Sequence, residues 1–211
     1  MHQSMKMPLI AILRGITAGE IHHHIPALLE AGFEAIEIPL NSPEWHRSLA
    51  QAVESYGKQL TIGGGTVTDV AAVEKLAGLG CRLVVSPNSN PEVIRAALQH
   101  KMQALPGCFT PTEAIAAVKA GASQLKLFPA ALFGPDYVRA LKSVLPASIA
   151  VWAVGGVTPE NLASFLLAGC VGAGLGSDLY RAGQTSRQTA ARAAAFAQAW
   201  RGYQLRQREA V

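Results

Sequence analysis

Short apolar runs recur along the chain at a nearly constant spacing. There are eight, each only a few residues long and rich in Ile, Val and Leu, and each starts 20–26 residues after the one before. Runs of this kind are typical of strands buried in a parallel sheet. They cover residues 9–13, 35–40, 60–65, 83–87, 103–107, 124–129, 149–154 and 172–176.

The segments between these runs have the apolar spacing of amphipathic helices. Several begin with capping residues: Thr110 stands three residues before Glu113, the spacing of a capping box, and Thr158 precedes Pro159. Several end at a glycine, which favours helix termination. The last stretch, about residues 185–207, alternates Ala with Arg and Gln and predicts an amphipathic closing helix.

Eight strand–helix units in succession predict an α/β fold, a compact (β/α)8 TIM barrel that forms a single domain over residues 1–211. A doubly wound open sheet is the alternative, but it requires a topological switch point and usually has five or six strands. Since a barrel typically takes about 250 residues, short loops are expected here.

Composition and charge narrow the function classes. No apolar stretch reaches the ~18–20 residues of a membrane span, and the first apolar run is too short for a secretory signal, so we expect a cytoplasmic protein with no membrane partner. The net charge of +4 comes largely from C-terminal arginines, from Arg181 to Arg208. Because no basic stripe with interleaved aromatics accompanies them, no nucleic-acid partner is expected. The three cysteines are far apart, and no His, Cys or acidic cluster has metal-ligand spacing, so no metal is expected.

Three ionisable residues fall inside or directly after apolar runs. Glu37 lies between Ile36 and Ile38, Lys126 lies between two leucines, and Arg14 closes the first run. Since strand side chains alternate between faces, Glu37 and Lys126 are expected to point into the barrel. A buried ion pair with a purely structural role is one interpretation. The functional one is that burial makes the Lys126 amine nucleophilic while Glu37 moves protons.

Glycine-rich loops follow the last two apolar runs. Gly155 and Gly156 follow the seventh run, and Ser177 follows the eighth. In many barrels these two loops bind phosphate through backbone N–H groups and a helix N-terminus, so we expect a phosphate site here. Tight turns without a ligand are the alternative. After the third run, Thr66 in GGGTV is a weaker candidate to donate a hydrogen bond to a substrate oxygen.

Eight short motifs follow one another between about residue 8 and residue 183. They are ILRG, EIPLNSPEW, GGGTV, LVVSPN, LPGC, LKLFPA, AVGGVTPEN and GLGSDLY. Single motifs are modestly specific, but their ordered set is highly specific, and with this set the chain resembles the KDPG/KHG aldolase family. The resemblance implies a class I (Schiff-base) aldolase that acts on a phosphorylated sugar acid, forms a homotrimer and uses neither a cofactor nor a metal.

Roles for individual residues also follow from the resemblance. It implies that Lys126 forms the imine and that Glu37 is the acid/base. Arg14 and Thr66 would hold the carboxylate end and the pyruvoyl oxygen, while Pro87 and Phe128 would pack around the pyruvyl group. The phosphate would be bound by Gly155, Gly156 and Ser177.

Two positions depart from the gluco-type pattern of the family. Asn41 stands where that pattern has Arg, and Val154 stands where it has Thr before the glycine pair. The resemblance therefore implies cleavage of 2-dehydro-3-deoxy-6-phospho-D-galactonate to pyruvate and D-glyceraldehyde 3-phosphate, with the gluco epimer as the alternative. A phosphosugar epimerase or isomerase, or a non-catalytic phosphosugar-binding barrel, are further alternatives on this fold. Lys126 disfavours them, since neither requires an imine.

Overall fold

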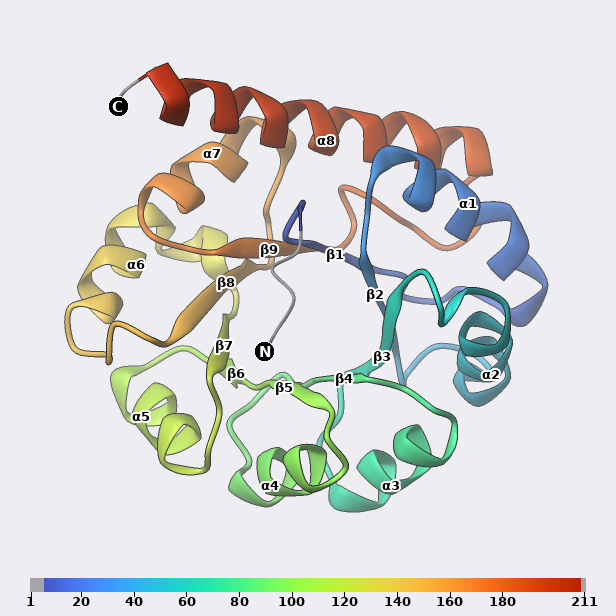
Figure 1. Cartoon of the computed structure of the whole chain (residues 1–211), viewed down its shortest axis with the longest axis horizontal. Coiled ribbons are helices and arrows are strands. Elements are labelled where there is room, and N and C mark those ends of the chain that lie inside the picture. The colour runs from blue at the N-terminus through green and yellow to red at the C-terminus, as the bar shows by residue number, and fades with distance from the viewer. Residues whose placement is uncertain (1–5, 210–211) are drawn as a thin grey trace.

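The computed structural model describes residues 6–209 and shows a ring of parallel strands enclosed by helices (Figure 1). The strands are β1 (Leu9–Ile12), β2 (Ala35–Pro39), β3 (Thr61–Gly65), β4 (Leu83–Val85), β5 (Gln103–Leu105), β6 (Gly107–Cys108), β7 (Gln124–Leu127), β8 (Ala150–Val154) and β9 (Gly172–Leu175). The α-helices are α1 (Ile21–Ala31), α2 (Trp45–Tyr56), α3 (Val70–Gly78), α4 (Pro91–Gln99), α5 (Pro111–Lys119), α6 (Gly134–Lys142), α7 (Pro159–Leu167) and α8 (Ser186–Glu209), with short 3-10 helices at η1 (Ala18–Glu20) and η2 (Ala130–Leu132).

The predicted single-domain (β/α)8 barrel is confirmed, and the main difference lies in the fifth strand. The strand expected over 103–107 is divided at Pro106, which has no N–H to donate. β5 pairs with β4, whereas β6 pairs with β7. The Pro106 carbonyl accepts a hydrogen bond from the Lys126 backbone N–H (N–O distance 2.8 Å), so this one strand turns from one neighbour to the other and completes the ring.

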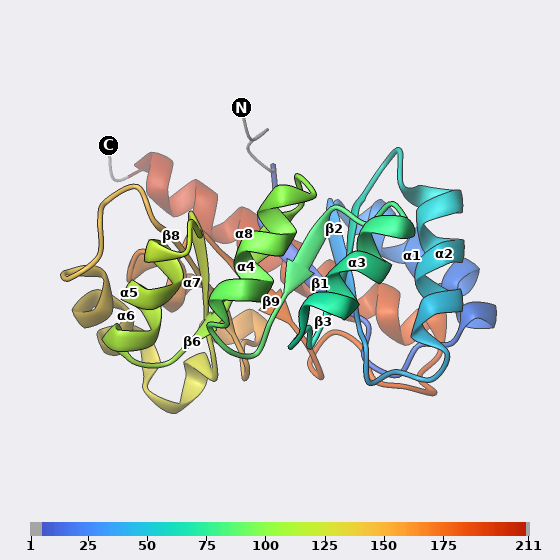
Figure 2. The same ribbon diagram turned by 90° about the horizontal axis from the view of Figure 1, so that it is seen from below.

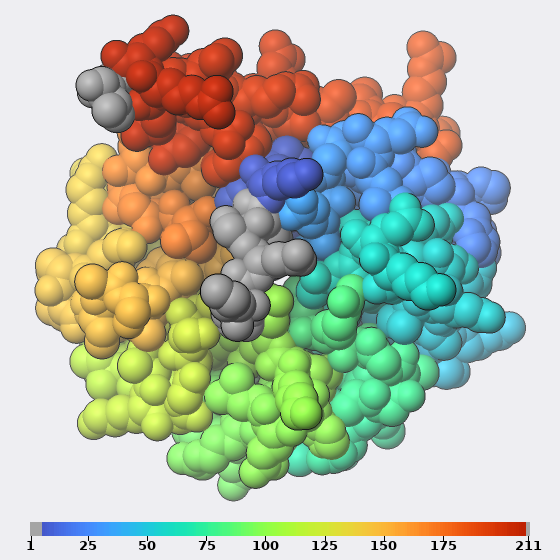
Figure 3. Space-filling view, in the orientation of Figure 1, coloured from blue at the N-terminus to red at the C-terminus, as the bar shows by residue number. Residues whose placement is uncertain are grey.

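Helix ends follow the capping chemistry that the sequence indicates. Thr110 and Glu113 form a reciprocal capping box at the start of α5, and Thr158 caps α7. At the C-terminus, α8 crosses one edge of the barrel and packs on α1 and α7 (Figure 3). The expected domain extended over residues 1–211, and its first five and last two residues lie outside those described. Among the helices that are described, none is long and apolar enough to cross a membrane.

Strand alternation divides the buried apolar side chains into two cores. Outward-facing residues such as Ile36, Leu125 and Val151 pack against the helices in one continuous cluster. A second, smaller cluster fills the inside of the barrel. It consists of Ile10, Ala35, Leu83, Val85, Leu105 and Trp152.

The interior changes character along the strands. Ala35 and Gln124 lie two residues before Glu37 and Lys126 on β2 and β7, and they therefore point to the same face. Inside the barrel, the Trp152 Nε1–H donates to Gln124 Oε1 (N–O distance 2.8 Å). The apolar cluster thus closes the end where the strands begin, and the ionisable residues lie toward the other end. Figure 2 shows the barrel from the side, with the loops after β7 and β9 at the lower end.

We predict that Trp152→Ala destabilises the barrel strongly. Trp152 is 5% exposed, and its removal leaves a cavity inside a ring of strands that cannot collapse easily. The free energy of unfolding should fall by about 3–5 kcal/mol, measured by urea denaturation. Leu205→Ala on α8 is the control: this side chain is 59% exposed, so its loss should change stability by about 0.5 kcal/mol or less. Equal effects of the two substitutions would contradict the role given to the inner cluster.

Candidate active site

A cavity of about 520 Å³ opens at the end of the barrel where the strands finish. All ten site residues that the sequence predicts line this one cavity: Arg14, Glu37, Thr66, Pro87, Lys126, Phe128, Val154, Gly155, Gly156 and Ser177. The remaining lining residues are Ile12, Val157, Gly176, Asp178, Tyr180, Arg181 and Ala182. Residues from seven strand ends or the loops after them therefore meet in one space.

Glu37 and Lys126 come from opposite sides of the ring. Their strands, β2 and β7, are separated by β1, β9 and β8 in one direction. Both side chains are buried, with 2% of Glu37 and 7% of Lys126 exposed. Their ionised groups make no salt bridge in the described part of the chain. This arrangement differs from the purely structural ion pair that the sequence left open.

Burial governs the ionisation of Glu37. Loss of solvent raises the pKa of its carboxyl from 4.5 to about 7, although the nearby charges of Lys126 and Arg14 act in the opposite direction. Within residues 6–209, its Oε2 atom has no hydrogen-bond partner. A carboxyl with a pKa near 7 and a free oxygen is suited to accept and return a proton at neutral pH.

Burial also governs the ionisation of Lys126. Burial lowers the pKa of its amine, Glu37 raises it, and the positive charge of Arg14 lowers it further. The Nζ atom lies over the Phe128 ring, 4.8 Å from its centroid. A lowered pKa increases the fraction of neutral amine, which is the form that attacks a carbonyl.

Three consecutive glycines shape the wall beside Glu37, and each is required by a different neighbour. A Cβ at Gly63 would collide with Leu83, one at Gly64 would overlap the Leu76 side chain, and one at Gly65 would occupy the position of the Glu37 carboxylate. The next residue, Thr66, has a φ of 58°. A β-branched residue seldom adopts this conformation, and its strain is consistent with a side chain that the fold directs into the cavity.

Arg14 is oriented by the loop after β2. Its Nη1 atom donates to Asn41 Oδ1 at 2.6 Å, and the next residue, Gly15, donates its backbone N–H to Ser42 Oγ at 2.9 Å. Asn41 itself is exposed and does not line the cavity. The sequence singled out Asn41 and Val154 as the two departures from the gluco-type pattern. In the structure, Val154 lines the cavity, whereas Asn41 contacts Arg14, which lines it.

The loop after β8 leaves backbone accessible to a ligand. Gly155 and Gly156 have φ values of 93° and 74°, which side chains rarely tolerate. A Cβ at Gly156 would also overlap Ala131. The Gly156 carbonyl accepts from Asn161 Nδ2 at 2.9 Å, which fixes the loop at the start of α7. This helix N-terminus and the neighbouring Ser177 give the cavity an end suited to an anion.

Sequence reasoning missed the residues that follow Ser177. Asp178, Tyr180, Arg181 and Ala182 line the cavity from the loop between β9 and α8. Arg181 was grouped with the arginines of the C-terminal helix, whereas the structure places it at the cavity. Its position in the sequence could have indicated this. Every loop that follows a barrel strand lies at the same end of the barrel, so a charged residue in the loop after β9 lies near the cavity opening.

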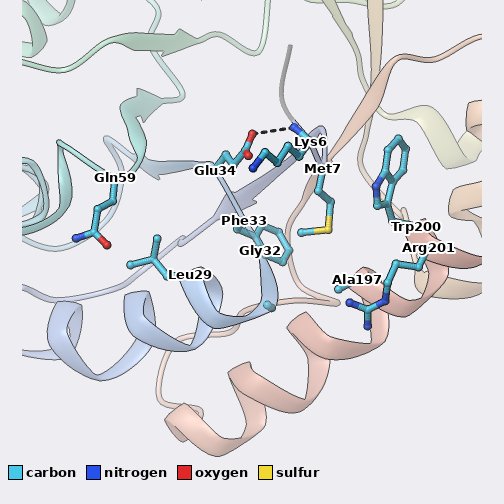
Figure 4. A pocket seen from close by; sticks show the side chains of 11 residues that line it. Lys6, Met7, Leu29, Gly32, Phe33, Glu34, Gln59, Ala197, Trp200 and Arg201 are labelled. Carbon is cyan, nitrogen blue, oxygen red and sulfur yellow. Dashed lines mark hydrogen bonds between the residues drawn. The ribbon is translucent and has the colours of Figure 1, made fainter. Parts of the chain in front are cut away.

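The opposite end of the barrel carries a second, shallower hollow (Figure 4). It lies between the start of β1, the end of α1 and the side chains of Trp200 and Arg201 on α8. None of the predicted site residues lines it. Its carboxylate, Glu34, already accepts the Lys6 backbone N–H at 3.0 Å. This hollow therefore offers no counterpart to the two buried ionisable groups of the first cavity.

Other candidate features lie away from the cavity. The adjacent histidines 22–24 point in different directions: His22 contacts Tyr56, and His24 bonds to Thr189. Cys81, Cys108 and Cys170 are buried and free. Across residues 6–209, no group of three or more His, Cys, Asp or Glu side chains is arranged to hold a metal ion.

A closed parallel barrel with a buried amine opposite a buried carboxyl defines an enzyme of the TIM-barrel class. A family model described as KDPG and KHG aldolase matches residues 2–195, and the chain belongs to this aldolase family. It is 57% identical over 201 residues to 2-dehydro-3-deoxy-6-phosphogalactonate aldolase of Escherichia coli (strain K12), which covers 95% of this chain and 98% of that protein. A probable aldolase of the same name from Rhizobium meliloti (strain 1021) is 49% identical over 191 residues, 90% of each chain. The solved native KDPGal structure superposes with a TM-score of 0.95 at 56% identity, over 97% of this chain and 100% of that one.

We predict that Glu37→Gln stabilises the fold at high pH. The carboxyl has a higher pKa in the folded chain (about 7) than its ordinary value of 4.5, so the folded state holds the proton more tightly. Wild-type stability therefore falls as the pH rises from 4.5 to 7 and stays reduced above that range. Glutamine does not ionise, so the variant should be more stable than wild type at pH 8 by on the order of 2–3 kcal/mol, and by much less at pH 5.

Urea denaturation at pH 5 and pH 8 measures this difference. Glu160→Gln is the control, because the Glu160 carboxyl lies at the surface and its removal should give no gain at pH 8. The same stability difference for Glu37→Gln at both pH values would show that burial does not raise the pKa of Glu37.

Proposed function

We propose that the chain is a class I aldolase that cleaves 2-dehydro-3-deoxy-6-phospho-D-galactonate to pyruvate and D-glyceraldehyde 3-phosphate. The observation that carries the mechanism is the buried, unpaired arrangement of Lys126 and Glu37 in one cavity. The names of the two similar enzymes described above support the substrate. The ten predicted site residues would bind this substrate from its carboxylate end to its phosphate end.

Lys126 begins the reaction. Its neutral amine attacks the C2 ketone of the substrate, and loss of water gives a protonated imine that can accept electrons from the bond to be broken. Because the imine itself is the electron sink, no metal is needed for this step. Arg14 and Thr66 would hold the carboxylate and the pyruvoyl oxygen, while Pro87 and Phe128 pack against the pyruvyl carbons.

Glu37 carries the protons of the following steps. It takes the proton of the C4 hydroxyl, directly or through a bridging water, and the C3–C4 bond breaks to release D-glyceraldehyde 3-phosphate. The bonding electrons form the enamine of pyruvate on Lys126. Glu37 returns a proton to C3 of that enamine, and hydrolysis of the imine frees pyruvate and the amine. Binding of the phosphate at Gly155, Gly156 and Ser177 would hold the C3–C4 bond in line between the two residues.

We also propose the assembly and location implied by the resemblance. Leu132 and Phe133, after β7, are 74% and 52% exposed and supply apolar surface for contacts between the subunits of a homotrimer. The three buried free cysteines suit a reducing compartment, which supports a cytoplasmic enzyme.

Borohydride reduction in the presence of pyruvate tests the imine. We expect the reduced three-carbon adduct on the peptide that contains Lys126, and on no other lysine, detected by mass spectrometry. Lys126→Met should abolish labelling. Lys142→Met is the matched control, because the Lys142 amine is bonded to the Gly169 carbonyl (N–O distance 2.9 Å) outside the cavity, and its loss should leave labelling intact.

Glu37→Gln completes this experiment. The adduct should still form, since Lys126 is unchanged, while kcat for cleavage falls about 10²–10⁴-fold, the usual contribution of general acid–base catalysis. Labelling of another lysine, or no labelling, would contradict the mechanism. Near-normal turnover of Glu37→Gln would assign the proton transfers to another group.

Val154 provides a test of epimer preference. It lines the cavity with a buried apolar side chain, and an apolar contact discriminates between hydroxyl configurations only weakly. We expect wild type to favour the galacto epimer with measurable activity on the gluco epimer. Val154→Thr should move the ratio of kcat/KM values toward the gluco epimer by roughly 1–3 kcal/mol. Val151→Thr, on the outer face of the same strand, should leave the ratio unchanged. A wild type that prefers the gluco epimer would overturn the proposed substrate.

A further inference from the structure

The loop between β9 and α8 carries Arg181, which lines the cavity but has no role in the proposed mechanism. Arg181 lines the cavity together with Ser177, four residues before it. Its side chain is exposed, yet its Nε–H donates to the Ser177 carbonyl (N–O distance 2.9 Å). The guanidinium is therefore held beside the residue expected to bind phosphate.

Hydrogen bonds fix the backbone that presents Arg181. Gln184 accepts the Arg181 backbone N–H at Oε1 (3.1 Å) and donates from Nε2 to the Leu179 carbonyl (3.0 Å). The same Nε2 atom lies 2.7 Å from Thr189 Oγ1 on α8. Thr189 Oγ1 in turn lies 2.7 Å from the Nδ1 atom of His24, a buried residue of α1. An ordinary mobile surface arginine has no such support, so this loop is built to hold one position.

A second arginine reaches the same point from α8. The Nη1 atom of Arg192 donates to the Ser177 carbonyl (N–O distance 2.8 Å). This one oxygen therefore accepts hydrogen bonds from the guanidinium groups of both Arg181 and Arg192. Within residues 6–209, neither arginine forms a salt bridge with a carboxylate. Two guanidinium groups thus lie beside Ser177 and neither is paired with a carboxylate, although Asp178 also lines the cavity, and this arrangement favours an anionic ligand.

We propose that Arg181 binds the phosphate of the substrate and determines the preference for phosphorylated over unphosphorylated aldehydes, with Gln184 as its positioning residue. This inference rests on the proposed aldolase function. The terminal nitrogens of Arg181 have no acceptor among the described residues and can bind two phosphate oxygens at once. Arg14 lines the same cavity from the loop after β1, and the next residue, Gly15, lies close to Ala182 of the Arg181 loop. The cavity therefore holds two cations for a substrate that carries a carboxylate and a phosphate.

The condensation direction separates phosphate recognition from imine chemistry. Pyruvate is supplied with either D-glyceraldehyde 3-phosphate or D-glyceraldehyde, and kcat/KM is measured for each aldehyde. For Arg181→Gln we expect kcat/KM to fall about 10–100-fold with the phosphorylated aldehyde, mostly through KM, because charge-assisted hydrogen bonds are lost. With the unphosphorylated aldehyde it should change less than about twofold. Arg181→Lys should recover part of the loss, since it keeps the charge without the planar fork.

Two controls make the result specific. Arg187→Gln removes one exposed charge from the start of α8 and should leave both aldehydes unaffected. Inorganic phosphate serves as a direct probe: it should inhibit wild type competitively against the phosphorylated aldehyde and inhibit Arg181→Gln at least several-fold less. Arg192→Gln should shift the phosphate preference in the same direction by a smaller factor, because Arg192 reaches the site only through Ser177.

The Schiff-base mechanism and the role of Arg181 are tested by different results. If wild type is not labelled by pyruvate and borohydride, the Schiff-base mechanism is wrong. If wild type is labelled and Arg181→Gln loses the same factor with both aldehydes, or loses nothing, Arg181 does not recognise phosphate. A Gln184→Ala variant with a normal KM for the phosphorylated aldehyde would overturn the positioning role of Gln184 alone.

Discussion

The structure depends on keeping a carboxyl and an amine out of water without allowing them to form an ion pair. Burying an ionisable group costs several kcal/mol unless it is paired, hydrogen-bonded or neutralised. Burial raises the pKa of Glu37 and lowers the pKa of Lys126, so Glu37 holds its proton more tightly than in water and Lys126 holds its proton less tightly. The rest of the cavity, from the Phe128 ring to the nearby charge of Arg14, adjusts this balance.

The barrel supports that balance by dividing its interior in two. The smaller apolar cluster around Trp152 fills the end where the strands begin and excludes water from that end of the barrel. Two residues further along β2 and β7, the same interior face carries Glu37 and Lys126 instead of apolar side chains. Chemistry and stability therefore share the same strands but occupy different levels. This explains how a chain of 211 residues accommodates both with short loops.

Much of the fold and the cavity could be predicted because they follow local rules. Regular spacing of apolar runs predicts the barrel, and strand alternation alone directs Glu37 and Lys126 inward. The division of the fifth strand at Pro106 depends on which neighbour each half pairs with, and this is a tertiary property. Arg181 was missed because its sequence neighbours resemble a helical tail, and only the path of the β9–α8 loop shows where it lies. The contact of Asn41 with Arg14 could not be predicted either, because this hydrogen bond joins two loops that are distant in sequence.

The three glycines before Thr66 have a consequence for how the chain tolerates change. They resemble a flexible linker in sequence, yet they form a strand. A methyl group at each position would clash with a different neighbour. Alanine at Gly63 would press on strand β4, alanine at Gly64 on helix α3, and alanine at Gly65 on the proton-transfer group itself. These adjacent residues are thus subject to three separate constraints, which come from strand pairing in the barrel, from helix packing and from catalysis. Variation among homologues at these positions would report on different properties of the enzyme, even though the positions are consecutive.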